Sequence, residues 1–485
     1  MQIVLPVLNI GGAGAQLIAA GTGMLIMIVD ALWRRGDRRW LGYLALLGLA
    51  AALGWTVCQR AQAQPVFGGA LAADGLSAGF ATVLIGAAML SVLVAMDYLR
   101  REGLEHGEYY ALILFATAGA LMMAAGADLA VIFIGLEALS ISLYVLSSFA
   151  KADAGSREAG LKYLLLGGFA SAFFLYGIAM LYGATGTTRL VEMGLVLRRA
   201  GSVADPLLWA GIGLVLVGLG FKLALVPFHT WAPDVYQGAP ISVTAFMSVI
   251  SKAAAFAVLV RLLMVVWGPV LPLTGTILAL LAVLTMTVGN ILALVQEDVK
   301  RLLAYSSIAQ AGYVLVAIVA GSELGASAVL FYLLGYALTN LGAFAVITAW
   351  SQRGEGRVPL SNLAGLGFRR PWMAAALTLC LLSLAGIPLT VGFVGKLYLF
   401  GAAVQAGWVW LAIIAVLNSV VSAFYYLHVV VVMYMREPGE AVSMERAGWP
   451  LGVALAICVA GVLALGLVPG PMLEWARRAL SLMLS

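Results

Sequence analysis

The chain has 485 residues, of which 63% are hydrophobic and only 10% are charged, and its mean hydropathy is +1.04. A soluble domain carries about 25% charged residues, so this composition excludes an ordinary soluble protein and indicates a membrane protein with many spans. The net charge of +5 does not indicate nucleic-acid binding, because the basic residues lie mainly in short loops between apolar segments.

Apolar segments long enough to cross a bilayer recur along the whole chain. The first lacks a basic leader and a small-residue cleavage site, so we expect a span and not a signal peptide. Polar residues and turns divide the chain into fourteen predicted spans, at 4–29, 40–57, 73–97, 109–125, 128–149, 160–183, 207–229, 240–266, 273–295, 300–320, 326–350, 371–400, 407–434 and 449–469.

The loops between these spans differ in charge from one side to the other. One set of alternate loops contains sixteen Lys and Arg residues, whereas the other set, together with the C-terminus, contains six. Because basic loops stay in the cytoplasm, we expect the first set to be cytoplasmic and both termini to be periplasmic. The remaining five of the 27 basic residues lie in predicted spans, and they are Lys162, Lys222, Lys252, Arg261 and Lys396.

Two of the predicted spans contain residues that break helices. In LGFKLALVPFHTWAPDVYQGAP, Lys222 is followed by three prolines, of which Pro227 is the nearest, and in SLAGIPLTVGFVGK, Gly386 and Pro388 precede Lys396. Proline removes a backbone donor and clashes with the preceding turn. Broken helices at membrane depth require protein or water around them, so the breaks and the nearby lysines indicate one hydrated interior.

A weak internal repeat connects the two broken spans. Residues 162–172 can be laid on residues 301–311 with an offset of 139, and one broken span follows each copy. Two five-helix units with an odd number of spans would have opposite orientations, as in many transporters. We therefore expect an all-α protein with two inverted five-helix repeats, divided into an N-terminal three-helix segment (1–108), a first repeat (109–266), a second repeat (267–435) and a C-terminal helix (436–485).

Four ionisable residues lie well inside the predicted spans, namely Glu137, Lys222, Lys252 and Lys396. A charge at the bilayer centre costs roughly 2.5–3.5 kcal/mol, so each one needs partners or water, and ion movement is the usual function of such residues. The structural alternatives are a hydrogen bond to a neighbouring helix for Glu137 and snorkelling for Lys222, which its position in mid-span makes difficult. We expect Glu137 and Lys222 to form an ion pair if their helices touch.

Other polar residues are less informative. His229, near Asp234 at the cytoplasmic end of the seventh span, could relay protons or simply cap the helix, and Lys162 near a helix start fits an interfacial anchor. Cys58, Cys380 and Cys458 are far apart and have no cluster-ligand spacing. We therefore expect no iron–sulfur centre, haem or other metal site in this chain.

Three motifs carry a resemblance to a known family. The runs GFKLALVPFHTWAPDVYQGAP, SVISKAAAF and EDVKRLLAYSSIAQAGY resemble those of the antiporter-like proton-pumping subunits of respiratory complex I. Relatives of these subunits occur in membrane-bound hydrogenases and multisubunit sodium/proton antiporters. The resemblance covers essentially the whole chain and is clearest over residues 75–435.

Within that family the chain is most similar to the subunit N group. It stops after the fourteenth predicted span, where the L type carries a long lateral helix. Lys396 stands where the M type typically has a glutamate, and Lys252 stands where the L type typically has a histidine.

The resemblance implies roles for the candidate residues. Glu137 and Lys222 would be the charge pair of the first half-channel, Lys252 the central relay and Lys396 the proton carrier of the second. Lys162 and His229 also fall on positions implicated in the family.

The resemblance also implies a membrane-arm subunit of a proton-translocating NADH:quinone oxidoreductase in the bacterial inner membrane. NADH, FMN, iron–sulfur clusters and quinone would bind in partner subunits, and the neighbours would be the antiporter-like subunit M, the small subunits K, J and A, and lipids. The alternatives are a subunit of a sodium/proton antiporter or membrane-bound hydrogenase, and a membrane scaffold that does not pump.

Overall fold

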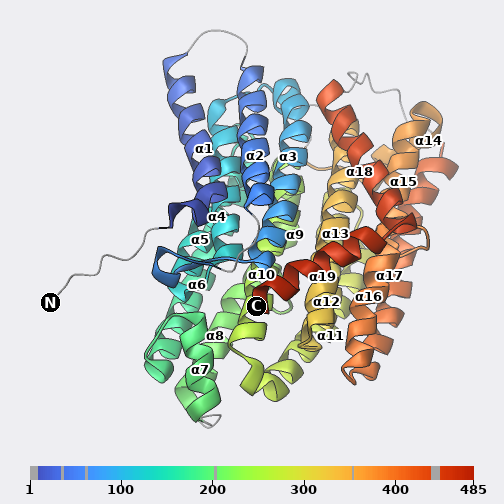
Figure 1. Cartoon of the computed structure of the whole chain (residues 1–485). Helices are drawn as coiled ribbons and strands as arrows, with labels where there is room; N and C mark the ends of the chain where they lie inside the picture. Colours follow the sequence, from blue (N-terminus) through green and yellow to red (C-terminus); the bar gives the residue numbers. More distant parts are fainter. Residues whose placement is uncertain are drawn as a thin grey trace.

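A computed structural model of the chain describes residues 9–33, 38–59, 64–200, 205–351, 354, 356–437 and 448–484. Nearly all regular structure in these residues is helical, and most helices run side by side in one bundle (Figure 1). The first five residues of the predicted 4–29 span lie outside the described residues, whose first helical turn is η1 (Ile10–Ala13).

The N-terminal part and the first predicted repeat contain ten helices longer than one turn among the described residues. They are α1 (Gly14–Leu32), α2 (Arg39–Cys58), α3 (Gly75–Glu102), α4 (Gly107–Ala125), α5 (Leu129–Ser147), α6 (Ala154–Thr185), α7 (Leu190–Ala200), α8 (Pro206–Leu223) and α9 (Trp231–Gly238), and α10 (Ile241–Val265) completes the repeat. A short antiparallel hairpin joins α2 to α3, with strands β1 (Gln64–Val66) and β2 (Leu71–Ala73) on either side of η2 (Phe67–Gly69).

The second predicted repeat and the C-terminal part follow in the same manner. Their elements are η3 (Gly268–Val270), α11 (Leu271–Leu294), α12 (Val299–Val319), α13 (Glu323–Trp350), η4 (Leu360–Leu363), α14 (Leu366–Arg369), α15 (Pro371–Ala385), α16 (Val391–Gln405), α17 (Val409–Met435), α18 (Trp449–Leu467) and α19 (Gly470–Leu484).

The predicted multi-pass architecture is confirmed. Thirteen of the described helices are long and apolar enough to cross a membrane, and the shorter apolar helices α15 and α16 together account for one more predicted span. The division into repeat units stays a prediction.

Both predicted helix breaks are present. α8 ends at Leu223 with Ala224 in a left-handed conformation (φ 56°), and the chain resumes as α9 at Trp231. α15 ends at Ala385 with Gly386 left-handed (φ 87°), and α16 begins at Val391. A non-glycine residue in this conformation costs of order 1–3 kcal/mol, so the surroundings of Ala224 hold it in a strained geometry.

The core lies around α10 and α12, whose most apolar stretches are enclosed on every side. By contrast, α1, α17 and α18 leave most of their apolar side chains exposed, as expected of helices that face lipid or a partner. The two enclosed helices therefore carry the side chains that are most completely shielded from the surroundings.

Several elements were not predicted from the sequence, among them the β1–β2 hairpin, α7, α9 and α19. Hydropathy did not predict α19, because Glu474, Arg477 and Arg478 interrupt its apolar residues. Leu473 and Leu480 are buried, and α19 packs against α3 and α13, crossing them obliquely (Figure 1). The C-terminal region therefore contains two helices and not one.

Candidate functional site

Three of the four buried lysines among the described residues form the candidate site, and the fourth, Lys300, lies at the start of α12. Lys222 on α8, Lys252 on α10 and Lys396 on α16 are exposed by only 2%, 3% and 4%. Among the described ion pairs, none joins any of these lysines to a carboxylate. Their partners are hydroxyl groups, backbone carbonyls and aromatic rings.

Lys222 lies in the last turn of α8, just before the first break. Its Nζ donates hydrogen bonds to Ser140 Oγ on α5 (2.8 Å) and to the Tyr163 hydroxyl on α6 (3.3 Å). The Tyr163 ring stacks on Trp231, the first residue of α9, with centroids 4.4 Å apart and planes 6° apart. The surroundings of Lys222 therefore include groups from both sides of the break.

The predicted ion pair between Glu137 and Lys222 is not formed in the described structure. The half-buried Glu137 accepts a hydrogen bond from Ser171 on α6, and Lys222 reaches Ser140 instead. Ser140 lies three residues after Glu137 and therefore on the same face of α5. The two charged groups remain neighbours, but the Ser140 hydroxyl provides the direct contact with the ammonium.

Lys252 lies midway along the enclosed helix α10. Its Nζ donates to the carbonyl and to the hydroxyl oxygen of Ser307 on α12. The hydroxyl of Tyr336 also donates to Ser307 Oγ, at 2.9 Å. A hydroxyl group can accept from an ammonium or donate to a neutral amine, so Ser307 suits either protonation state of Lys252.

Lys396 lies in the second turn of α16, after the second break. Its Nζ donates to the carbonyls of Leu384 (2.9 Å) and Ala385 (3.1 Å) and to Ser419 Oγ (2.9 Å), and it lies 4.6 Å from the centroid of the Tyr313 ring. The last carbonyls of a helix have no partner within it. The break in the span thus supplies the acceptors that hold this lysine.

Polar side chains lie between Lys252 and Lys396. Ser306, adjacent to Ser307, shares a hydrogen bond with the Tyr426 hydroxyl. Gln310 donates to that hydroxyl (3.1 Å) and to the Leu384 carbonyl (3.0 Å), the oxygen that also binds Lys396. Sequence reasoning missed Gln310 and Tyr426, although Ser306, Ser307 and Gln310 form a polar stretch in an otherwise apolar helix.

Lys222 and Lys252 are connected through backbone. Ser251, adjacent to Lys252, donates its hydroxyl hydrogen to the carbonyl oxygen of Lys222 at 3.3 Å. Together with the contacts above, this places all three lysines on one row of polar groups that passes through the enclosed part of the molecule.

His229 and Lys162 lie apart from this row. His229 is in the first break, and its buried Nδ1 has no hydrogen-bond partner among the described residues. Lys162 is partly exposed on α6 and forms ion pairs with Asp234 on α9 (2.9 Å) and with Glu158 (2.8 Å). Asp234 also pairs with Arg301 of α12 at 2.8 Å.

Asp234 is held in its ionised form by these two cations. Partial burial on its own raises the pKa of the carboxyl group, but the hydrogen bonds from Lys162 and Arg301 outweigh burial and hold the pKa of Asp234 below its ordinary value.

A cavity of about 540 Å³ lies beside Asp234. It lies between the start of α6, α9 and the start of α12, and its lining includes six charged residues, Asp153, Glu158, Lys162, Asp234, Arg301 and Arg357. Successive spans alternate in direction, so this cavity opens at the end of the bundle where α6 and α12 begin.

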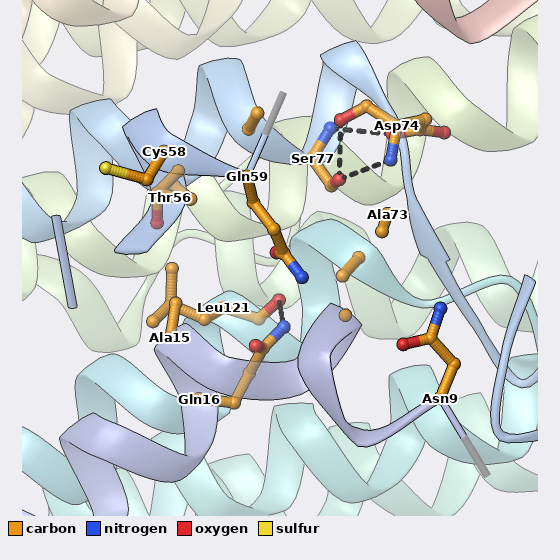
Figure 2. Close-up of a pocket in the computed structure, with 14 residues that line it drawn as sticks. Asn9, Ala15, Gln16, Thr56, Cys58, Gln59, Ala73, Asp74, Ser77 and Leu121 are labelled. Carbon is orange, nitrogen blue, oxygen red and sulfur yellow. Dashed lines mark hydrogen bonds between the residues drawn. The ribbon is translucent and has the colours of Figure 1, made fainter. Parts of the chain in front are cut away.

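A second cavity, of about 370 Å³, is lined by residues from the starts of α1 and α3 and the ends of α2 and α4 (Figure 2). Gln16 donates to the Leu121 carbonyl there, and Asp74 and Ser77 cap the start of α3. This cavity is separate from the row of lysines.

Asp74 also forms a buried ion pair that the sequence did not predict. Arg261 of α10, one of the five basic residues in the predicted spans, binds both carboxylate oxygens of Asp74, at 2.7 and 3.0 Å. Burial on its own raises the pKa of Asp74, but the guanidinium outweighs it and holds that pKa below its ordinary value. The pair joins the N-terminal segment to the enclosed helix.

No group of three or more His, Cys, Asp or Glu residues in the described part of the chain is arranged to hold a metal ion. The free cysteines Cys380 and Cys458 are buried, and Cys58 is exposed.

Comparison with known proteins identifies the family. Residues 126–422, more than half of the chain, match the family described as NADH:quinone oxidoreductase/Mrp antiporter, TM. The chain belongs to this family. NADH-quinone oxidoreductase subunit N of Trichlorobacter lovleyi is 44% identical over 480 residues, which cover 98% of this chain and 98% of the relative.

Solved structures show the same fold. A chain of respiratory complex I from Thermus thermophilus is 38% identical, with a TM-score of 0.81, over 95% of this chain and 98% of that chain. A chain of the membrane-bound sulfane sulfur reductase, an archaeal respiratory membrane complex, is 28% identical, with a TM-score of 0.84, over 98% of each chain. The predicted membership of the subunit N group is confirmed by its full-length relatives.

Proposed function

We propose that this chain carries protons across a bacterial inner membrane as the N-type membrane-arm subunit of an NADH:quinone oxidoreductase. One observation carries the proposal, namely the row of polar groups on which Lys222, Lys252 and Lys396 lie in the enclosed part of the bundle. A buried cation is costly, and three of them on one row serve ion movement better than they serve stability.

In this mechanism the lysines hold and pass the proton. The uptake side is the end of the bundle where α6 and α12 begin, and transfer runs from Lys222 to Lys252 and on to Lys396. Glu137 lies three residues before Ser140 on α5. Its charge acts on the proton affinity of Lys222, which Ser140 contacts directly. Ser307 and Gln310 provide hydroxyl and amide groups that can reorient as the proton passes. Lys162 and His229 act on the uptake side.

Quinone reduction would drive the transfer from elsewhere in the complex. NADH, FMN, iron–sulfur clusters and quinone would bind to other subunits, and subunits M, K, J and A would be the membrane-arm neighbours. Both termini would face the periplasm. Labelling of a cysteine placed at either terminus of the assembled complex, with reagent on one side only, tests that orientation.

The lysines can be tested in inverted membrane vesicles that contain the assembled complex. NADH is added, and quinone reduction and proton uptake are recorded together. Lys222→Met and Lys396→Met should each lower both rates strongly, because the redox reaction and transport are coupled. Variants that assemble normally and keep full proton uptake would refute the proposal. They would favour the alternative that this chain is a membrane scaffold that does not pump.

Relatives with other activities provide the second candidate, a subunit of a sodium/proton antiporter or of a membrane-bound hydrogenase. The family description includes Mrp antiporters. The higher identity to the subunit N relative, 44% against 28% for the sulfane sulfur reductase chain, favours the first candidate. Purification decides between them, because a complex containing flavin and iron–sulfur clusters that oxidises NADH excludes a simple antiporter.

A further inference from the structure

Asp234 receives ion pairs from two helices that correspond in the internal repeat. Under the offset of 139 residues, Lys162 of α6 aligns with Arg301 of α12. In the structure both residues bind the same carboxylate, Lys162 through Oδ2 at 2.9 Å and Arg301 through Oδ1 at 2.8 Å. We call these two ion pairs the Asp234 bridge.

The bridge is centred on α9, the short helix that follows the first break. α9 packs against both α6 and α12. Further contacts tie it to the start of α12, since Arg301 also donates to Gln237 (3.4 Å) and the buried Lys300 donates to the carbonyl of Ala239 (2.8 Å). By contrast, Lys162–Asp234 is the ion pair that ties α9 to α6.

Each end of the bridge is close to one of the proton-carrying lysines. Tyr163, adjacent to Lys162, binds Lys222 and stacks on Trp231 of α9. On the other side, Ser307 binds Lys252 and lies six residues after Arg301, about 9 Å along α12. A shift of α9 relative to α6 would therefore alter the surroundings of Lys222 while Lys252 keeps its partner.

The bridge also borders the 540 Å³ cavity on the proposed uptake side. We propose that Asp234 is a positioning residue that holds α6 and α12 together through α9, and so controls access to this cavity and the fit of Tyr163 to Lys222. The inference rests on the proposed function for its role in transport, whereas the packing of α6 against α9 beside the cavity is a property of this chain alone.

The packing of α6 against α9 can be measured without any redox reaction. Ala159 lines the cavity on α6 and is only 2% exposed, so a cysteine there reports opening. The assembled complex carries Ala159→Cys in a background with Cys58→Ser, and a membrane-impermeant maleimide is added to inverted vesicles. Asp234→Asn should increase the labelling rate roughly three- to tenfold, as the loss of partly exposed ion pairs implies. Asp234→Glu, which keeps the charge, should leave the rate near that of the parent.

Glu158 provides the matched control. It also pairs with Lys162, at 2.8 Å, but it lies on the same helix and joins nothing to α9. Glu158→Gln should therefore change the labelling rate by less than about twofold. Equal labelling in Asp234→Asn and its parent, or an equal increase in Glu158→Gln, would overturn the inference. If Asp234→Asn does not assemble, Lys162→Met releases only the α6 side of the bridge and should give the same increase.

Proton uptake per NADH, measured in the same vesicles, separates this inference from the proposed function. Faster labelling together with reduced uptake in Asp234→Asn supports both. Asp234→Asn could instead give faster labelling with normal uptake, while the Lys222 and Lys396 variants also pump normally. That combination would support the Asp234 bridge and refute the pumping role. Reduced uptake with unchanged labelling would refute the bridge alone.

Discussion

Gln310 and Lys396 donate hydrogen bonds to the same carbonyl oxygen, that of Leu384, at 3.0 and 2.9 Å. This oxygen is left without a helical partner because α15 ends at Ala385. Gln310 also accepts from Tyr332 and donates to Tyr426. The second helix break is therefore where the polar groups of α12 meet the lysine of α16.

Replacing Gln310 with leucine should disturb the hydrogen bonds around the Leu384 carbonyl. The change leaves the hydroxyl of Tyr332 without its acceptor and the Leu384 carbonyl with one donor fewer, at a cost of about 1–3 kcal/mol. We expect proton uptake per NADH in vesicles to fall markedly while the complex still assembles. Thr276→Val is a suitable control, because its exposed hydroxyl donates to the Pro272 carbonyl of the same helix, α11. Full coupling in Gln310→Leu would show that the row of polar groups does not need this amide.

Lys252 can be tested as a titrating group by two substitutions. Lys252→Met removes the charge and should lower quinone reduction and proton uptake together. Lys252→Arg keeps a charge that does not release its proton near neutral pH, so it should also be impaired. Both rates are measured in vesicles with matched amounts of assembled complex. An arginine variant that pumps at the wild-type rate would make Lys252 a fixed structural cation.

Ser140 should matter as much as Glu137 for the first lysine, since it provides the direct contact. Ser140→Ala removes the 2.8 Å acceptor of the buried Lys222 ammonium, and hydrogen bonds to charged groups contribute about 1.5–3 kcal/mol. We expect Ser140→Ala and Glu137→Ala to reduce proton uptake, and Glu137→Asp to reduce it less than Glu137→Ala. Unchanged uptake in Ser140→Ala would mean that Lys222 does not use this contact during transport.

The buried pair of Asp74 and Arg261 should contribute to stability. Removing one partner of such a pair leaves an uncompensated buried charge, which costs about 3–5 kcal/mol. Asp74→Asn should therefore lower the thermal unfolding temperature of the purified complex or its yield, and Arg261→Met in addition should restore part of the loss. Glu192→Gln, which affects the exposed pair with Arg189, should have little effect. A double variant no better than Asp74→Asn would contradict this reasoning.

The Asp234 bridge should not titrate near neutral pH. Because the pKa of Asp234 lies below its ordinary value of about 4, the carboxylate stays ionised above that value, and its contribution is lost only as pH falls further. The facing groups Lys162 and Arg301 stay charged over the same range, whereas Asp153, Glu158 and Arg357 line the cavity more widely. The ratio of Ala159→Cys labelling rates in Asp234→Asn and its parent should be constant from pH 6 to 8. A ratio that falls towards one at pH 6 would show that Asp234 takes up a proton there.

The spans, the two breaks and the three interior lysines were evident in the sequence itself. Hydropathy over about 20 residues identifies a membrane helix because every part of that helix meets the same apolar surroundings. Proline and glycine near 227 and 386–388 act on their own backbone, so the breaks also follow from local sequence. Elements with mixed polarity, such as α7, α19 and the β1–β2 hairpin, have neither a long apolar stretch nor a breaking residue that would predict them.

Only the tertiary structure decided the partners of these lysines. Ser140 lies 82 residues from Lys222, Ser307 lies 55 residues from Lys252, and Arg301 lies 67 residues from Asp234. Which side chains meet depends on the rotation and depth at which helices pack, and hydropathy leaves both undetermined. For this reason the sequence indicated that Lys222 needs a partner, whereas packing placed the Ser140 hydroxyl there and joined α6 and α12 through Asp234.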